Sequence, residues 1–319
     1  MVERENVIIT RKAVMIGCGF VGSASAFALM QTGLFSEMVL IDADRKRAEG
    51  EAMDISHGVP FASPMKIYAG DYEDIKDAMV VIIAAGANQK PGETRLDLVY
   101  KNVEIFHSII PRIVEQNFDG ILLVVSNPVD ILTYTALKLS GYPANRVISS
   151  GTVLDTARLK YEVGQHLGVD SRSVHAFIIG EHGDSELAAW SSATVAGMPI
   201  NDFCELRGHY NHEEATERIF DNVKNSAYEI IERKKATYYG IAMAVKRICE
   251  AIVRDEESIL PVSSYMNGEN GISGVVLSMP AILGANGIEK LIPVALNNAE
   301  NQKLQRSAKT LREIIQEIH

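Results

Sequence analysis

Cysteine is scarce in this chain of 319 residues, which contains three. Cys18, Cys204 and Cys249 are widely spaced and form no CxxC pair. An odd number at such spacing excludes a disulfide framework and a zinc knuckle, so we expect no bound metal. A reducing compartment is the simplest setting for three unpaired thiols.

Long runs of positive charge are also missing. Lys and Arg number 31 against 41 Asp and Glu, which makes the formal net charge −10. No basic run is longer than three residues, as at Arg233, Lys234 and Lys235. A surface this acidic repels nucleic acid and anionic lipid, so we exclude both as partners.

The sequence lacks an apolar leader and an evident membrane span. Its first residues, Met-Val-Glu-Arg-Glu-Asn, are charged and have no apolar centre of the kind that signal peptides carry. Residues 271–288 are uncharged, but their glycines, Pro280 and Asn286 favour short buried strands joined by turns. We expect a soluble, cytoplasmic protein.

The length and the apolar pattern of the first half predict two domains, because one domain takes about 150 residues. Strand-like apolar runs at 12–16, 38–41, 79–84 and 121–125 alternate with helical patterns at 21–32, 45–56, 95–116 and 130–139. Runs that are apolar throughout fit strands buried on both faces. Residues 1–150 are therefore predicted to form an α/β domain with a doubly wound parallel sheet.

The second half, residues 151–319, has a different pattern. Strand-like runs at 174–179 and 187–195 lie between helical stretches at 153–167, 213–232 and 238–252. Residues 259–266 and 272–279 predict an antiparallel pair, and a final helix ends the chain. This pattern indicates an α+β domain.

A glycine-rich turn follows the first strand. Residues 17–22 read GxGxxG, directly after the strand and at the start of a helix. In this context Gly17 permits the tight turn, Gly19 lets a pyrophosphate approach the backbone, and Gly22 allows close packing. Asp42 ends the second strand, where a carboxylate binds ribose hydroxyls and favours NAD over NADP. The motif predicts a Rossmann domain; the alternative is an ordinary strand–turn–helix connection with an incidental Asp.

Polar residues in the second half are suited to proton transfer and anion binding. His182 lies in the loop Gly-Glu-His-Gly-Asp after an apolar run, where an imidazole can exchange protons at neutral pH. Asp155 and Arg158 share one helix face, so one can orient an imidazole and the other can grip a carboxylate. The alternatives are a structural histidine and a surface salt bridge.

Two loops follow strands of the first half. The loop 86–95, bracketed by Gly86, Pro91 and Gly92, has the composition of a moving loop and ends at Arg95. The alternative interpretation of residues 86–95 is a solvated loop that does not move. Asn127 follows the strand at 121–125, where its amide can bind cofactor or substrate, or cap the next helix.

These motifs occur together in a known order. The glycine fingerprint is followed by Gln-Lys-Pro-Gly-Glu-Thr-Arg, Ser-Asn-Pro-Val-Asp, Leu-Asp-Thr-Ala-Arg, Gly-Glu-His-Gly-Asp and Ala-Thr-Tyr-Tyr-Gly. On these six motifs the chain resembles the NAD-dependent lactate/malate dehydrogenase family over nearly its whole length, and within it the bacterial L-lactate dehydrogenase branch.

The resemblance implies roles for the catalytic residues. His182 is similar to the family's proton donor and acceptor, and Asp155 to the carboxylate that orients it. Arg158 resembles the clamp for the substrate carboxylate. Arg95 resembles the mobile arginine that polarises the reacting carbonyl when the loop closes.

The resemblance also implies an NAD site and the walls of a substrate site. Thr237 corresponds to a wall of the substrate pocket, and Gln89 and Asn127 to further substrate contacts. The residues implied to bind the cofactor are Gly17, Gly19, Phe20, Val21, Gly22, Asp42, Gly86, Asn127 and Ile241. The implied activity, in glycolysis and fermentation, is hydride transfer between NADH and pyruvate that gives L-lactate and NAD⁺.

Assembly and regulation are implied as well. The family implies a homotetramer, and its bacterial branch often binds fructose bisphosphate between subunits through an Arg and a His. His175 matches the His, but Lys160 replaces the Arg and loses its bidentate fork. Allosteric activation and its absence therefore both remain open. Cys18 and Lys235 also depart from the family pattern, and Cys18 introduces a thiol open to oxidation.

Gln89 distinguishes the activities within the family. Malate dehydrogenases carry Arg at this position, where it pairs with the second carboxylate of oxaloacetate. A neutral Gln89 leaves that carboxylate unpaired, at a cost of several kcal/mol, and favours pyruvate. The alternatives are a dehydrogenase for malate or another 2-hydroxy acid, and an NAD-binding protein without activity.

We predict that Gln89→Arg shifts the preference from pyruvate toward oxaloacetate by orders of magnitude, because the new guanidinium pairs with the second carboxylate. The measurement is the ratio of kcat/KM for the two substrates. An unchanged ratio would contradict the assignment of Gln89.

Overall fold

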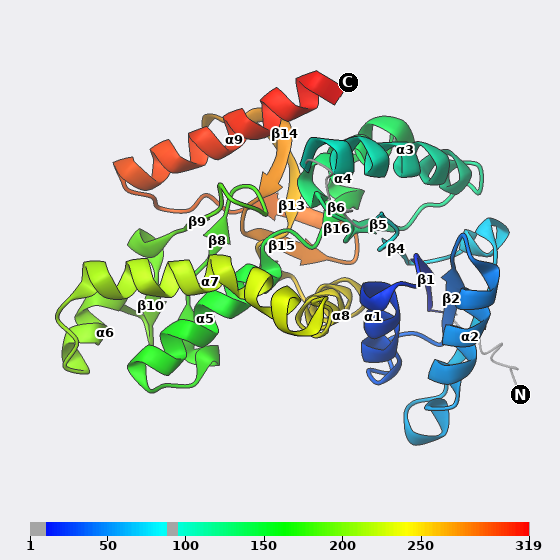
Figure 1. Cartoon of the computed structure of the whole chain (residues 1–319), viewed down its shortest axis with the longest axis horizontal. Helices are drawn as coiled ribbons and strands as arrows, with labels where there is room; N and C mark the ends of the chain where they lie inside the picture. The colour runs from blue at the N-terminus through cyan, green and yellow to red at the C-terminus, as the bar shows by residue number, and fades with distance from the viewer. Residues whose placement is uncertain (1–10, 88–94, 319) are drawn as a thin grey trace, which may run out of the picture.

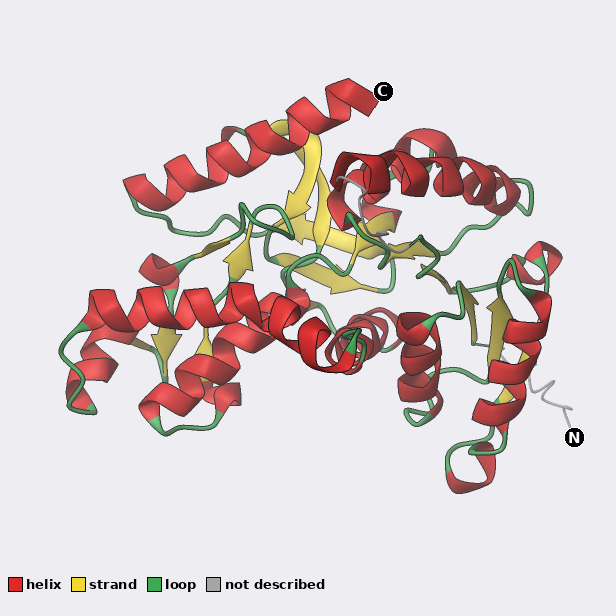
Figure 2. Ribbon diagram, in the orientation of Figure 1, coloured by secondary structure: helices red, strands yellow, loops and turns green. Residues whose placement is uncertain are grey.

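An eight-stranded sheet forms the centre of the molecule, and helices cover both of its faces (Figures 1 and 2). The computed structural model describes residues 11–87 and 95–318. The strand order is β14-β13-β6-β5-β4-β1-β2-β3. These strands are β1 (Lys12–Ile16), β2 (Glu37–Ile41), β3 (Lys66–Ala69), β4 (Val80–Ile83), β5 (Ile121–Val124), β6 (Val147–Ser149), β13 (Ser263–Asn267) and β14 (Ser273–Ser278).

The remaining elements are helices and very short strands. The helices are α1 (Phe20–Met30), α2 (Arg45–Ser56), α3 (Arg95–Val114), α4 (Val129–Ser140), α5 (Val153–Leu167), α6 (Ile200–Leu206), α7 (His212–Lys234), α8 (Tyr239–Val253) and α9 (Asn298–Ile318). The strands are β7 (Val174–His175), β8 (Ile178–Ile179), β9 (Leu187–Ala188), β10 (Thr194–Val195), β11 (Met198–Pro199), β12 (Ser258–Leu260), β15 (Ala281–Gly284) and β16 (Gly287–Leu291).

The six strands of the first half are parallel, which confirms the predicted doubly wound sheet. Their order, β6-β5-β4-β1-β2-β3, is that of a Rossmann domain. The order in which the chain adds strands reverses at β1 and β4, so the loops after these two parallel strands lead to opposite sides of the sheet. Ligands of such sheets bind in the crevice that this divergence opens.

Alternation along the strands explains the covering helices. In β1, Val14 and Ile16 belong to a core with α3, α4 and α9, whereas Ala13 and Met15 belong to a second core with α1, α2 and α8. Side chains of a strand point alternately to opposite faces. A run that is apolar throughout therefore needs a helical layer on each side.

The predicted antiparallel pair of the second half joins the sheet of the first half. β13 pairs with β14, as predicted, and also with the edge of β6 through Ser263 and Ser149. The first strand of the pair was predicted over 259–266, but this segment divides into two strands. Its beginning forms β12, which pairs with β15 in a separate sheet. The chain therefore returns to the nucleotide half after building much of the second half.

Other predicted strands are also interrupted. The run 174–179 splits into β7 and β8, which lie in different sheets, and 187–195 splits into β9 and β10. In the eight-stranded sheet, two strands, β3 and β6, were not predicted. β3 lies at the sheet edge with no buried residue, and β6 has three residues, so neither produces a long apolar run. Periodicity detects runs of buried residues; β3 has no buried residue, and β6 is buried but too short to form such a run.

A third core joins α5 and α7 with the short strands β7, β8 and β10. In Figure 1 these elements lie to the left of the sheet, and α9 crosses above β14. Among the described residues, no helix is long and apolar enough to cross a membrane.

We predict that Phe106→Ala lowers the free energy of unfolding by about 3–5 kcal/mol, because Phe106 of α3 is fully buried against the sheet. The measurement is urea denaturation. Tyr210→Ala is the matched control, since Tyr210 is 74% exposed and its loss leaves stability within about 0.5 kcal/mol. Equal effects of the two substitutions would contradict this account of the core.

Candidate active site

A cavity of about 340 Å³ lies where α3, α4, α5, α7 and the loop before β9 meet. Four of the predicted site residues line it: Asn127, Asp155, Arg158 and His182. They come from three separate segments of the chain, so their convergence is a property of the fold. Lys224, Tyr228 and Ile231 of α7 form the opposite wall.

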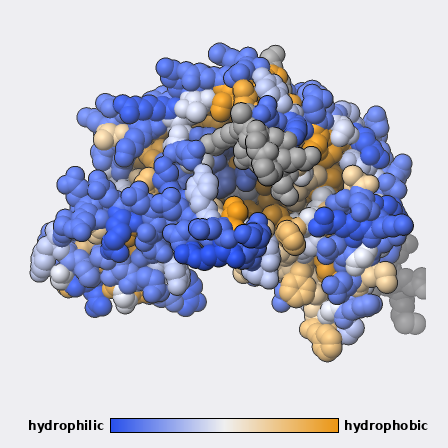
Figure 3. All heavy atoms as spheres, viewed as in Figure 1, coloured by the Kyte–Doolittle hydropathy of each residue, from blue (hydrophilic) through white to orange (hydrophobic). Residues whose placement is uncertain are grey.

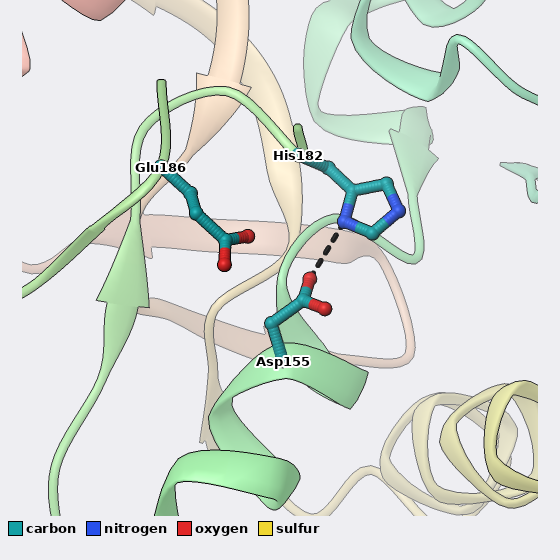
Figure 4. Close-up of side chains that lie close together, drawn as sticks. All are labelled: Asp155, His182 and Glu186. Carbon is teal, nitrogen blue, oxygen red and sulfur yellow. Dashed lines mark hydrogen bonds and ion pairs between the residues drawn. The ribbon is translucent and has the colours of Figure 1, made fainter. Parts of the chain in front are cut away.

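Asp155 contacts both His182 and Arg158. One of its carboxylate oxygens, Oδ2, lies 2.6 Å from Nδ1 of His182, as Figure 4 shows, and Oδ1 accepts a hydrogen bond of 2.8 Å from Nη1 of Arg158. The Asp155 side chain is 3% exposed, against 26% for His182 and 15% for Arg158. A buried carboxylate with two such partners holds both rigidly.

The charges of this group shift its pKa values in opposite directions. Burial by itself lowers the pKa of His182, but the Asp155 carboxylate outweighs burial and raises that pKa to about 9. Burial works against the charge of Asp155 too, yet His182 and Arg158 hold its pKa below the usual range. At neutral pH the pair is therefore an imidazolium beside a carboxylate.

The loop that carries His182 is fixed by its backbone. The His182 N–H donates to Oδ2 of Asp130 over 2.7 Å, and the Glu181 N–H donates to the Ser307 hydroxyl of α9 over 2.8 Å. Gly180 has φ +91° and exchanges backbone hydrogen bonds with Ser278 of β14. Because α4 of the first half and α9 and β14 of the second half all hold this loop, the position of the imidazole depends on both halves of the chain.

Asn127 is held by its own backbone and by its neighbours. Asn102, 2% exposed on α3, donates to the Asn127 carbonyl over 2.7 Å and accepts from the Ala87 N–H over 2.8 Å. The Ser126 hydroxyl donates to the Ala85 carbonyl over 2.6 Å. These bonds join the loops after β4 and β5 and leave the Asn127 amide directed at the cavity, which it lines.

The glycine fingerprint has the predicted geometry. Gly17 has φ +97°, and a Cβ there would lie 2.4 Å from the Ala85 nitrogen. A Cβ on Gly22 would lie 1.8 Å from the Gly17 carbonyl oxygen. Nothing lies within 4 Å of a Cβ position on Gly19, which begins α1 without a side-chain cap. The open, uncapped first turn of α1 suits a pyrophosphate, so these residues fit a dinucleotide.

Asp42 lies beside this turn, as predicted for a ribose contact. Its Oδ2 accepts from the Cys18 N–H over 2.6 Å, and its Oδ1 accepts from the Asp44 N–H over 2.9 Å. The expected sensitivity of Cys18 to oxidation has no support here. Cys18 is buried, and burial and the nearby Asp42 raise the pKa of its thiol to about 12, so the reactive thiolate does not form.

The other predicted residues lie outside the lining of the cavity. Gly86 is exposed after β4, Thr237 lies between α7 and α8, and Ile241 of α8 packs against the second core. Gln89 lies outside the described residues. Arg95 begins α3, but its side chain is likewise not described.

The two effector candidates and Lys235 lie elsewhere. Lys160 is half-buried on α5, where burial lowers its pKa, and His175 is exposed on β7. Lys235 ends α7 with φ +72°. That left-handed conformation favours glycine, and a side chain there adds strain of about 1 kcal/mol.

Sequence reasoning missed three polar residues of the site. Asp130 and Asn102 hold the loops, and Glu186 lines the cavity with 8% exposure. Asp130 lies within a motif that carries a predicted residue, and Glu186 lies two residues after another such motif, which is a signal for further inspection. Asn102 lies in a helix with no local signal. Within the described segments, Asp155, His182 and Glu186 form a group whose ligand atoms lie within 4.8 Å of one another.

Comparison with known proteins agrees with this geometry. Residues 11–149 match the family model described as the NAD binding domain of lactate/malate dehydrogenase, and residues 152–319 match its alpha/beta C-terminal domain. The L-lactate dehydrogenase of Acetivibrio thermocellus is 55% identical over 97% of this chain and 98% of that protein. L-lactate dehydrogenase 1 of Clostridium acetobutylicum is 53% identical over 96% and 98%.

Solved structures give the same result. The minor L-lactate dehydrogenase of Enterococcus mundtii, in its ligands-bound form, has a TM-score of 0.95 and 45% identity, covering 98% of this chain and 99% of that one. Its ligands-unbound form has a TM-score of 0.90. The chain belongs to the lactate/malate dehydrogenase family and is an NAD-dependent oxidoreductase.

Proposed function

We propose that this enzyme interconverts pyruvate and L-lactate with NADH and NAD⁺. The observation that carries the proposal is the contact of Asp155 with both His182 and Arg158 at one cavity wall. A 2-oxo acid needs a proton donor for its carbonyl and a cation for its carboxylate, and these two residues supply them. The neutral Gln89 and the names of the relatives favour pyruvate over oxaloacetate.

Arg158 binds the substrate carboxylate in this proposal. One of its nitrogens donates to Asp155, and the rest of the guanidinium borders the cavity. A guanidinium binds a carboxylate through two parallel hydrogen bonds, which orients the substrate as well as attracting it. Arg95, Asn127 and Thr237 complete the substrate contacts, with Arg95 polarising the reacting carbonyl.

His182 transfers the proton. Its Nδ1 is engaged by Asp155, so the proton that moves is on Nε2. During reduction His182 donates this proton to the carbonyl oxygen, and during oxidation it takes the proton back. Asp155 keeps the ring oriented and stabilises the imidazolium. The nicotinamide, when bound, supplies or accepts the hydride.

The cofactor binds at the carboxyl ends of β1, β2 and β4. The first turn of α1 would bind the pyrophosphate, and the Asp42 carboxylate would accept hydrogen bonds from the ribose hydroxyls. Residues 1–150 thus hold NAD, and residues 151–319 supply the acid–base pair. The proposed cofactor contacts are Gly17, Gly19, Phe20, Val21, Gly22, Asp42, Gly86, Asn127 and Ile241.

The enzyme assembles as a homotetramer in the cytoplasm, where lactate formation ends a fermentation. Support for assembly comes from an exposed apolar face on α1, α8 and the segment after α2. Phe27 is 50% exposed, Met243 56% and Phe61 94%. Figure 3 shows hydrophobic side chains gathered at the lower right, where Figure 1 has α1 and the end of α2. Such patches mark subunit contacts.

We expect His182→Asn to lower kcat for pyruvate by about 100- to 10,000-fold, because the proton donor is lost. NADH binding should stay unchanged, because His182 is not one of the proposed cofactor contacts. The assay follows NADH oxidation with pyruvate, oxaloacetate and 2-oxoisocaproate in turn. Oxidation with oxaloacetate alone would support a malate dehydrogenase, and none in the wild type would support a binding protein.

Lys160 and His175 form an allosteric anion site for fructose bisphosphate in this proposal. We expect the bisphosphate to lower the pyruvate KM, and Lys160→Ala to remove the effect. Lys160→Arg is the matched variant, and it should strengthen activation by restoring the bidentate fork. A titration of KM that is flat in all three proteins would contradict the site.

A further inference from the structure

Glu186 is a buried acid at the catalytic pair. It is the fourth residue after His182 and immediately precedes β9. It is 8% exposed, and its N–H donates to the Gly183 carbonyl over 3.1 Å, which closes the loop. Figure 4 shows its carboxyl group directed toward the space between His182 and Asp155. The ligand atoms of the three residues lie within 4.8 Å of one another.

The charged groups around Glu186 come from every element that packs there. Asp155 and Arg158 face it from α5, with His182 from its own loop. Across the cavity, Lys224 donates to the Asp184 carbonyl over 3.0 Å, and the Tyr228 hydroxyl donates to the Asp184 carboxylate. Asp130 of α4 lies behind, bound to the His182 N–H. No hydrogen bond to the Glu186 carboxyl occurs within residues 11–87 and 95–318.

The substrate changes the charge balance of this group. With His182 protonated, the charges of Asp155 and Arg158 cancel, and one positive charge on His182 remains. An incoming 2-oxo acid carries one negative charge, which that imidazolium balances. An ionised Glu186 would place a second carboxylate beside Asp155 in the buried wall that receives the substrate anion, and like charges this close repel one another.

Protonation of Glu186 accounts for the charge of this group better than a bound metal ion does. Three ligand atoms this close are also a spacing that a cation could use. However, Nδ1 of His182 already shares a proton with Asp155, and Arg158 already neutralises that carboxylate. A divalent ion would have to displace both. Protonation of Glu186 removes its charge and disturbs neither contact.

We propose that Glu186 is a positioning residue whose proton controls substrate entry: the neutral acid admits the substrate anion beside His182, and the carboxylate excludes it. This inference rests on the proposed function, because it needs an anionic substrate on Arg158. Burial and the neighbouring Asp155 raise the pKa of Glu186 to about 8, which agrees with a neutral acid at neutral pH. Productive binding then requires two protons, one on each residue.

The first test is the pH profile of kcat/KM for pyruvate. In the wild type, the logarithm of kcat/KM should fall above about pH 9 with a slope approaching −2, because two protons are lost. In Glu186→Gln the slope should be −1, because His182 alone titrates. Glu217→Gln, an exposed change on α7, is the matched control and should keep the wild-type slope. Equal slopes in wild type and Glu186→Gln would overturn the proposal.

The second test uses the wild-type protein and needs no variant. Oxamate, the amide isostere of pyruvate, is titrated into the complex with NADH near pH 9, and proton uptake is measured by calorimetry in buffers of different ionisation enthalpy. Uptake of more than one proton per subunit is expected, which one histidine cannot supply. If the wild type reduces pyruvate but takes up one proton or fewer, the role of Glu186 is overturned and the proposed function stands. A wild type that neither reduces pyruvate nor binds oxamate would overturn the proposed function and this inference with it.

Discussion

The carboxylate of Asp155 is the interaction on which the site depends. It is 3% exposed and holds His182 with one oxygen and Arg158 with the other. One buried anion therefore keeps a proton on the imidazole and positions the guanidinium. Its own charge is costly to bury, and the two cations offset that cost. Removing Asp155 would leave two cations in the cavity without the anion that pairs with both.

The fold serves this contact by supporting the two sides separately. Asp155 and Arg158 lie on the first turns of α5, directly after β6. His182 lies on a loop held by α4, α9 and β14. The β13–β14 hairpin crosses back to pair with β6, so the two sides share one sheet. Because one sheet supports both sides, the 2.6 Å distance between Asp155 and His182 does not depend on a hinge between two domains.

The acidic surface and the anionic ligands are compatible because charge is distributed locally. The chain has a formal net charge of −10, yet NAD and a 2-oxo acid are both anions. The open first turn of α1, Arg158 and protonated His182 supply positive charge where it is used. The excess acid faces solvent, where it keeps the protein soluble.

Much of the fold could be predicted from periodicity. The buried strands β1, β4 and β5 show continuous apolar runs, and the helices that cover them have clear stripes. The edge strand β3 could not be predicted because none of its residues is buried, and β6 could not because its three buried residues are too few to form a recognisable run. In the site, the motifs contain His182, Asp155 and Arg158. Asn102 could not be predicted, because its partners are backbone groups of distant loops.

The sequence by itself determined the class of site: a glycine turn after a strand, an acid at the end of the next strand, and a histidine in a glycine-bracketed loop. These are local patterns, and local backbone geometry requires them. Only the tertiary structure decided which charges meet. The contact between Asp155 and His182 and the burial of Glu186 beside them join residues that are far apart in the chain or carry no local signal. Electrostatic energy depends on distance and burial, and both are set by packing.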